Sequence, residues 1–257
     1  MMANPARRPA LIEVQHVSKR FGGLTALDDV SFAVPGGHVL AVIGPNGAGK
    51  STLINCLSGA VDMDAGRMLI EGRPIRRNFN AQLVQLGITR TFQNVRLFAS
   101  LTALEHLLLA RRAYERTRRY YDRTRAKESD ARTVCLDLLD RVGLAPKKDN
   151  YPSELAYGER RRLEIARGLA IDPKLFLVDE PAAGSTGAEQ MSLAALIGDI
   201  ATSGAAVILV EHHMDLIGRV ADSVTVLNFG QVIATGSFEA IKRNPVVIAA
   251  YLGTQAA

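Results

Sequence analysis

Residues 44–52 read GPNGAGKST, a glycine-rich segment that ends in a lysine and two hydroxyl side chains. Residues 39–43 before it are apolar and rich in β-branched side chains, which predicts a buried strand. Leu53, Ile54 and Leu57 after it recur at helical spacing, which predicts a helix. A strand, a glycine-rich loop and a helix in this order are the context that a phosphate-binding loop requires.

The residue types of the loop suit an anion and its metal. Gly44, Gly47 and Gly49 let the backbone turn tightly, so that its amides can approach a phosphate. The helix predicted to begin near Lys50 directs the positive end of its dipole at the same point. The Lys50 ammonium can reach β- and γ-phosphates, and the Ser51 hydroxyl suits Mg²⁺. A plain glycine turn is the alternative, and further motifs along the chain argue against it.

Length and composition limit the possible classes of protein. The chain has 257 residues, enough for one large domain or two modest ones. No apolar run approaches the roughly 20 residues that span a bilayer, and the start, MMANPARRPA, is too polar for a secretory signal. Cys56 and Cys135 are too few for a disulfide framework, which fits a reducing cytoplasm, and we expect both to be buried.

Positive charge is concentrated in one segment. The net charge is +5, and residues 111–127, RRAYERTRRYYDRTRAK, carry much of the excess. Such a run could face anionic lipid headgroups or nucleic acid. It could equally be the solvated face of a helix, which is the more common case.

Strands and helices alternate along the chain, which predicts an α/β core. Leucines at helical spacing between residues 101 and 144 predict a mostly helical insertion, with the basic run on its exposed side. A turn is expected at residues 18–23, and a hairpin around Phe229-Gly230. Strands are expected at residues 11–17, 30–34, 39–43, 66–72, 175–178, 206–210, 224–228 and 231–234. Helices are expected at residues 160–170, with one apolar and one basic face, at 189–203 and within 237–253.

Polar side chains follow two of the apolar strands. Asp179 and Glu180 come after residues 175–178, and Glu211-His212-His213 follow residues 206–210. Ligands of open α/β sheets gather at the carboxyl ends of the strands. An Asp-Glu pair could instead cap a helix, and a histidine after a strand is usually structural.

These groups together can hydrolyse a nucleoside triphosphate. Asp179 suits Mg²⁺, and Glu180 beside it can orient and deprotonate an attacking water. His212 could contact the γ-phosphate, and the Gln93 carboxamide can touch both metal and water. Catalysis of this kind consists mainly of positioning and charge stabilisation.

The ordered set of motifs resembles an ATP-binding-cassette (ABC) ATPase over nearly the whole chain. GPNGAGKST matches the Walker A motif, LFLVDEP the Walker B motif, TFQN the Q-loop, LAYGE the family signature and VEHHM the H-loop. The resemblance implies a P-loop NTPase (RecA-like) α/β core with an N-terminal antiparallel β subdomain and an inserted α-helical subdomain. The cassette would span residues 11–253, with the core at 11–93 and 171–253 and the helical subdomain, which includes the signature, at 94–170.

The match is closer to one branch, the LivG-type ATPases of branched-chain amino acid importers. KRFGGLTAL, TRTFQNVRLF, LAYGERRRLEIARGLA and NPVVIAAYLG carry this likeness. The extended basic helical segment after Gln93 also looks like LivG rather than its shorter LivF partner.

The family implies a role for each motif residue. Glu180, His212 and Gln93 would be catalytic, and Ser51, Gln93 and Asp179 would hold Mg²⁺. The implied ATP-binding residues are Phe21, which would stack on adenine, Gly44, Pro45, Asn46, Gly47, Ala48, Gly49, Lys50, Ser51, Thr52, Ala156, Tyr157, Gly158 and Glu159.

The family also implies partners. Two ATPase subunits, a LivF-like heterodimer or a homodimer, would sandwich two ATP molecules, each signature facing the other subunit's phosphate loop. They would drive two membrane permease subunits, and indirectly a substrate-binding protein, from the cytoplasmic face of the membrane. The same ATPase role could instead serve the import of urea or amides, or the export of lipopolysaccharide. A soluble ATPase on nucleic acid is a further alternative, but the chain lacks the insertions or second cassette of such members.

The chain departs from the family pattern at three places. Ala156 stands where many members have Ser, so a hydroxyl contact to phosphate is absent. His213 falls where Asp is more common. After Walker B the branch usually reads AAGLNP, whereas residues 182–187 read AAGSTG. The last change puts coupling between the two ATP sites in doubt, but not nucleotide binding.

Overall fold

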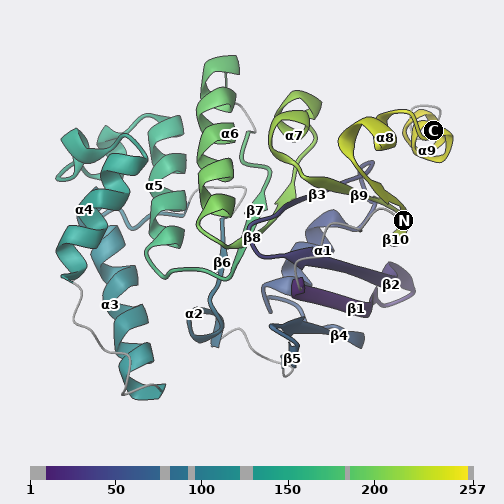
Figure 1. Ribbon diagram of the computed structural model, residues 1–257, viewed down its shortest axis with the longest axis horizontal. Coiled ribbons are helices and arrows are strands. Elements are labelled where there is room, and N and C mark those ends of the chain that lie inside the picture. The colour runs from purple at the N-terminus through teal and green to yellow at the C-terminus, as the bar shows by residue number, and fades with distance from the viewer. Residues whose placement is uncertain (1–9, 76–81, 92–95, 122–129, 183–185, 254–257) are drawn as a thin grey trace, which may run out of the picture.

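The computed structural model describes residues 10–75, 82–91, 96–121, 130–182 and 186–253 of the chain. Within these residues the chain forms two β-sheets, with helices between and around them (Figure 1). Gln93 and Ser185 lie outside the described residues, as does most of the second half of the basic run.

The larger sheet has, in the described part of the chain, six strands in the order β10-β9-β3-β8-β7-β6. The strands from β9 to β6 run parallel, and β10 pairs with β9 in the antiparallel sense. They are β3 (Val39–Ile43), β6 (Ile88–Arg90), β7 (Leu175–Asp179), β8 (Ala206–Val210), β9 (Ser223–Asn228) and β10 (Gln231–Gly236). Every residue of β3, β7 and β8 is buried, which confirms the prediction of parallel strands covered on both faces.

The smaller sheet is antiparallel, in the order β2-β1-β4-β5 (Figure 1). Its strands are β1 (Ala10–Phe21), β2 (Leu24–Pro35), β4 (Ala65–Ile70) and β5 (Arg73–Pro74). The predicted turn over residues 18–23 is wrong, because β1 continues to Phe21 and pairs there with Leu24. The polar residues Lys19 and Arg20 still pair with β2, with register shifts on either side of Lys19. The turn is therefore confined to Gly22 and Gly23.

Helix α1 (Lys50–Leu57) follows the 44–52 loop and packs against side chains of both sheets. Leu53 and Ile54 are fully buried in a cluster that includes Val14 of β1 and Val42 of β3. Burial of each large aliphatic side chain is worth about 1.5–3 kcal/mol. The loop that precedes α1 is therefore fixed by the main core of the molecule.

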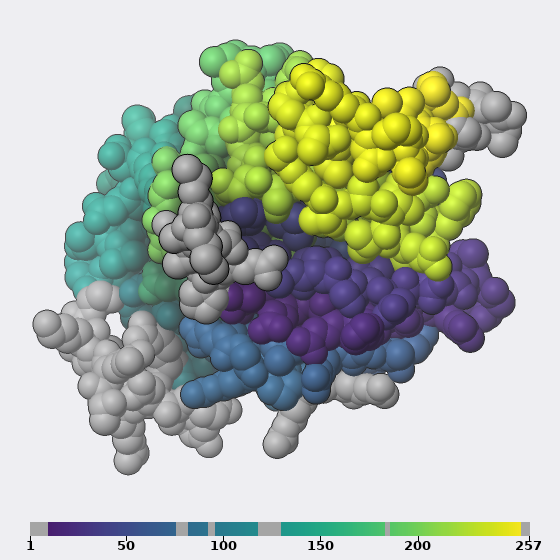
Figure 2. All heavy atoms as spheres, turned by 45° about the vertical axis from the view of Figure 1, so that its right-hand side comes forward, coloured from purple at the N-terminus to yellow at the C-terminus, as the bar shows by residue number. Residues whose placement is uncertain are grey.

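Helix α2 packs against the same core cluster as α1, whereas the remaining helices lie on the other side of the larger sheet or at its β10 end (Figure 1). Helices α3 to α5 form a separate group, and Figure 2 shows the C-terminal helices beside the N-terminal strands on one face. The helices are α2 (Leu83–Leu86), α3 (Ala103–Tyr121), α4 (Ala131–Arg141), α5 (Tyr157–Leu169), α6 (Gly187–Thr202), α7 (Met214–Val220), α8 (Phe238–Lys242) and α9 (Pro245–Gly253). The predicted helical insertion is thus present, while the domain boundaries at residues 94 and 170 stay predictions.

Two arginines that the sequence predicts on exposed faces are buried. Arg111, the first residue of the basic run, forms ion pairs with Asp172 at 2.8 Å and Glu115 at 2.9 Å. Arg161, on the predicted basic face of α5, pairs at 3.0 Å with Glu164, which is itself buried. Helical spacing predicted these positions as solvated, but each charge has a partner that makes burial possible.

Both cysteines are free and buried, as predicted. Burial raises the pKa of Cys56 and of Cys135 to about 11, so neither is a reactive thiolate at neutral pH.

Among the described helices, none combines the length and the apolar character needed to cross a membrane.

Candidate functional site

The register of the larger sheet brings three predicted motifs to one edge. Val42 of β3 pairs with Val210 of β8, which pairs in turn with Asp179 of β7. The Glu180 amide extends this row by donating to the Val210 carbonyl at 2.9 Å. The phosphate loop, the Asp-Glu pair and the H-loop therefore leave adjacent parallel strands at the same carboxyl end, where α/β sheets bind ligands.

The phosphate loop has a conformation that only glycine can adopt at two positions. Gly44 has φ 150°, and a Cβ there would collide with the Leu227 carbonyl oxygen. Gly49, the N-cap of α1, has φ 102°, and its Cβ would lie 2.5 Å from the Ala26 carbonyl oxygen. The amide of Gly230 also donates to the Ala48 carbonyl at 3.0 Å. The loop is thus braced from behind by β2 and by the turn between β9 and β10.

Lys50 bends back over the loop that precedes it. Its Nζ donates to the carbonyls of Gly44 at 2.7 Å and Pro45 at 2.9 Å. Burial lowers the pKa of the Lys50 ammonium, whereas the charges of Glu180 and Asp179 raise it. The lysine therefore lies within electrostatic reach of both Walker B carboxylates.

The two carboxylates at the end of β7 have different environments. Asp179 is 7% exposed, and its Oδ2 pairs with the Arg90 guanidinium at 3.0 Å. Glu180 is half-buried and has φ 43°, a left-handed conformation that is strained for a side chain of this type. Such strain gathers at functional sites, and Glu180 is the predicted general base. Ser51, another of the three predicted metal ligands, is exposed at the start of α1.

The H-loop is organised by a buried carboxylate. Glu211 Oε1 accepts hydrogen bonds from the amides of His212 at 2.8 Å and His213 at 3.2 Å, and its partner is also the His213 ring, with Nδ1 at 2.6 Å. The His212 side chain is 58% exposed and lies against the His213 ring, with centroids 4.2 Å apart. His213 is thus held inward, and His212, the predicted switch residue, faces outward.

Phe21 and the signature lie at the ends of other elements. The Phe21 ring at the end of β1 is 48% exposed, with Lys19 Nζ 5.3 Å from its centroid.

Ala156 is the N-cap of α5, and its amide donates to Glu159 Oε2 at 3.0 Å. Lys147 pairs with Glu159 at 2.7 Å, and this hydrogen bond, followed by that from Ala156, lowers the pKa of Glu159.

The structure brings only part of the predicted set together within one chain. The phosphate loop, Asp179, Glu180 and His212 share the carboxyl edge of the larger sheet. Within the described residues, the signature instead lies against other parts of the same chain. Lys147 Nζ donates to Glu159, and the Glu189 side chain of α6 lies where a Cβ on Gly158 would be. This separation fits a signature that acts on the loop of a second subunit.

Two residues of the site were given no role from sequence. Arg90 reaches Asp179 from β6, and Glu211 accepts the Ala182 amide at 3.1 Å besides the H-loop amides. A carboxylate directly after the fully apolar strand β8 was a usable signal for Glu211. Arg90 had no comparable signal, because its partners are far away in the sequence.

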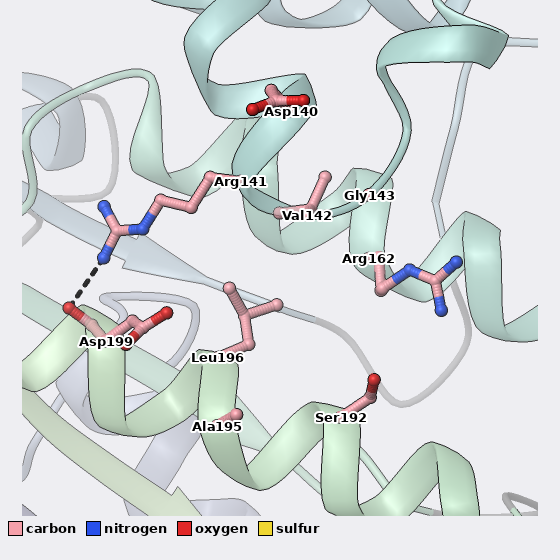
Figure 3. A pocket seen from close by; sticks show the side chains of 9 residues that line it. All are labelled: Asp140, Arg141, Val142, Gly143, Arg162, Ser192, Ala195, Leu196 and Asp199. Atoms are coloured by element: carbon pink, nitrogen blue, oxygen red, sulfur yellow. Dashed lines mark hydrogen bonds between the residues drawn. The ribbon is translucent and has the colours of Figure 1, made fainter.

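A separate cavity of about 440 Å³ lies between α4, α5 and α6 (Figure 3). Across it, the Arg141 guanidinium donates to the Asp199 carbonyl at 2.7 Å, joining α4 to α6. None of the predicted site residues lines this cavity. Its lining residues are Asp140, Arg141, Val142, Gly143, Arg162, Ser192, Ala195, Leu196 and Asp199.

Comparison with known families identifies the class of protein. The ABC transporter family matches residues 27–183, and the branched-chain amino acid ATP-binding cassette transporter family matches residues 231–257. The chain therefore belongs to the ABC transporter family and is an ATPase of that family.

Its relatives include two curated proteins of one kind. The chain is 37% identical over 249 residues to the high-affinity branched-chain amino acid transport ATP-binding protein LivG of Salmonella typhimurium, covering 95% of this chain and 98% of that protein. It is 38% identical over 249 residues, with the same coverage, to the corresponding BraF of Pseudomonas aeruginosa. The predicted resemblance to LivG-type subunits is confirmed.

Solved structures show the same fold. An ATP-binding cassette of an ABC transporter in its ADP conformation has a TM-score of 0.83 and 30% identity, covering 95% of this chain and 99% of that one. A nucleotide-free ATP-binding cassette has a TM-score of 0.81 and 30% identity, with 94% and 98% covered. The predicted fold class, a P-loop NTPase core with an antiparallel sheet and a helical insertion, is confirmed.

Proposed function

We propose that this protein binds and hydrolyses MgATP to power import of branched-chain amino acids. The observation that carries the catalytic part is the row from Val42 through Val210 to Asp179, which aligns three motifs at one sheet edge. The cargo is inferred from relatives whose names specify branched-chain amino acid transport.

The donor set at this edge fits Mg²⁺. Hard cations take oxygen ligands, and Ser51 and Asp179 supply a hydroxyl and a carboxylate. The Arg90 ion pair uses Asp179 Oδ2, and no described residue donates to Oδ1. When bound, the metal would neutralise phosphate charge. Gln93 is proposed to join these ligands, although it lies outside the described residues.

The other side chains are proposed to bind, orient and move a proton. The loop amides of residues 44–52 and the Lys50 ammonium hold the phosphates, and Phe21 stacks on the adenine. Glu180 takes the proton of the attacking water, and His212 contacts the γ-phosphate. Because phosphoryl transfer leaves little covalent chemistry for the protein to do, positioning and charge stabilisation supply most of the rate enhancement.

The signature is proposed to complete the site of a second ATPase subunit, LivF-like or identical to this chain. The N-terminus of α5 at Ala156 to Glu159 would offer amides and a positive dipole end to the other subunit's γ-phosphate. The pair would work at the cytoplasmic face of a membrane with two permease subunits and, indirectly, a substrate-binding protein.

Glu180→Gln tests the hydrolytic role. The variant should bind MgATP as the parent does, while turnover falls at least about a hundredfold, because a general base has been removed. Glu71→Gln, at an exposed ion pair with Lys174, is the matched control and should keep normal turnover. Normal hydrolysis by the Glu180 variant would refute the general-base assignment.

The cargo is tested on the complex with its membrane subunits and binding protein in liposomes. Leucine, isoleucine or valine should raise the ATPase rate, and labelled leucine should accumulate inside. Stimulation by urea or short amides instead, or ATP-dependent extraction of lipopolysaccharide, would overturn the proposed cargo and leave the ATPase role intact.

A further inference from the structure

Arg90, the last residue of β6, connects three parts of the site. Its Nη2 pairs with Asp179 Oδ2 at 3.0 Å, and its Nη1 donates to Asn55 Oδ1 at 2.7 Å and Ser58 Oγ at 3.0 Å. Asn55 belongs to α1, the helix of the phosphate loop, and Ser58 is its C-cap. One guanidinium therefore joins strand β6, the end of α1 and the Walker B aspartate.

The ion pair is largely withdrawn from water. The side chains of Arg90 and Asp179 are 11% and 9% exposed. A planar guanidinium presents its donors in a fixed fork, so binding to α1 on one side sets the direction of the donor on the other. Lysine carries the same charge but cannot hold these partners in one plane.

The ion pair with Arg90 uses only one of the two carboxylate oxygens of Asp179. Arg90 engages Oδ2, and no described residue donates to Oδ1. The Thr91 hydroxyl accepts from the Asp179 amide at 3.4 Å, and the Thr91 amide donates to the Leu177 carbonyl at 2.9 Å. Arg90 and Thr91, which precede the Q-loop, therefore bind the end of β7 through both backbone and side-chain atoms.

We propose that Arg90 is a positioning residue for the metal site: it holds the Asp179 carboxylate at a fixed orientation relative to α1, so that one oxygen is presented to Mg²⁺. This inference rests on the proposed MgATP site.

Partners that orient metal ligands typically contribute about 10–100-fold to metal affinity or activity. Losing the fork should therefore raise the Mg²⁺ concentration at half-maximal nucleotide binding about tenfold. Binding of nucleotide without metal should change less than about twofold, because the loop amides and Lys50 do not depend on Asp179 for their contacts with phosphate.

The experiment measures equilibrium binding of a fluorescent, non-hydrolysable ATP analogue to the full chain, during a Mg²⁺ titration and in EDTA. Arg90→Met and Arg90→Lys should both shift the Mg²⁺ midpoint, and Asn55→Ala should shift it in the same direction by less. A parental midpoint in Arg90→Lys would mean that charge alone matters, which overturns the proposal. Equal losses with and without Mg²⁺ would mean a structural role and would overturn it too.

Arg111→Met is the matched control, because Arg111 is an equally buried, ion-paired arginine of α3. It should lower the unfolding temperature without moving the Mg²⁺ midpoint. If Arg90→Met does not fold, the lysine variant and Asn55→Ala still decide the question. A parent chain that bound no analogue at all would refute the proposed function, whereas a parent with normal Mg²⁺ dependence and unchanged variants would refute only this inference.

Discussion

The Glu211 carboxylate accepts the Ala182 amide at 3.1 Å, and thereby ties the segment after Walker B to the H-loop. Glu211 is 1% exposed, and its other oxygen accepts the amides of His212 and His213. One buried charge thus sets the distance between the predicted general base, two residues before Ala182, and the predicted switch histidine.

Glu211→Gln should lower the free energy of unfolding by about 2 kcal/mol, because hydrogen bonds to a charged acceptor are worth about 1.5–3 kcal/mol. The new amide nitrogen would also have to face an N–H donor on one side. Urea unfolding measures the change. Glu71→Gln, at an exposed pair, should cost no more than about 1 kcal/mol. Equal stabilities of the two variants would contradict the role given to Glu211.

Gly44→Ala should weaken nucleotide binding at least about tenfold, because avoiding the Leu227 carbonyl distorts the loop by strain of about 1–3 kcal/mol. Binding of a fluorescent ATP analogue measures this effect. Gly143→Ala is the control, since its φ of 68° is also left-handed but a Cβ there meets nothing within 4 Å. Gly143→Ala should lower stability slightly and leave nucleotide binding unchanged. A similar loss of binding in both variants would refute the steric argument.

The sequence predicts the elements whose signals are local. β3, β8 and the first four residues of β7 are apolar runs, and the carboxylates at the ends of β7 and β8 identify the active edge. It does not predict features made by distant partners. Arg161 looks solvated from its helical spacing, because the Glu180 carbonyl that it contacts at 3.2 Å comes from the end of β7. Arg90 looks like an ordinary strand residue, because its three partners come from other elements.

The unusual residues after Walker B have a local structural consequence. Thr186 is the N-cap of α6: its Oγ1 accepts the Glu189 amide at 3.4 Å, and its own amide donates to Glu189 Oε2 at 2.8 Å. This reciprocal pair is a capping box. Thr186 therefore starts the helix whose Glu189 side chain lies beside Gly158 of the signature.

Thr186→Ala should lower the free energy of unfolding by about 1 kcal/mol, the usual loss for a helix N-cap. Thr186→Ser keeps the hydroxyl and should restore most of the stability. Thermal and urea unfolding of the three proteins measure the difference. If the alanine and serine variants unfold at the same urea concentration, the hydroxyl does not cap α6.

His106 of α3 is locked as a neutral ring. Its Nε2 accepts the Phe98 amide at 2.9 Å, so Nδ1 must carry the proton and donate to the Thr102 carbonyl at 2.8 Å. Burial lowers the pKa of His106, the Thr102 hydrogen bond raises it, Arg167 lowers it and Glu105 raises it, with a net decrease below 6.5. Protonating Nε2 would break the bond from Phe98 and leave a charge inside the helical insertion.

This depressed pKa predicts a loss of stability in acid. Above about pH 6.5 the ring is neutral in both states, so its contribution is complete. As the pH falls below that value, the unfolded chain binds a proton that the folded chain does not, and the free energy of unfolding decreases by up to about 1.4 kcal/mol per pH unit until the folded pKa is reached. His106→Gln can donate to Thr102 and accept from Phe98 without titrating in this range. Urea unfolding from pH 7.5 to 5 should therefore show a shallower acid slope for the variant, and equal slopes would refute the assignment because His106 is then not the group that titrates.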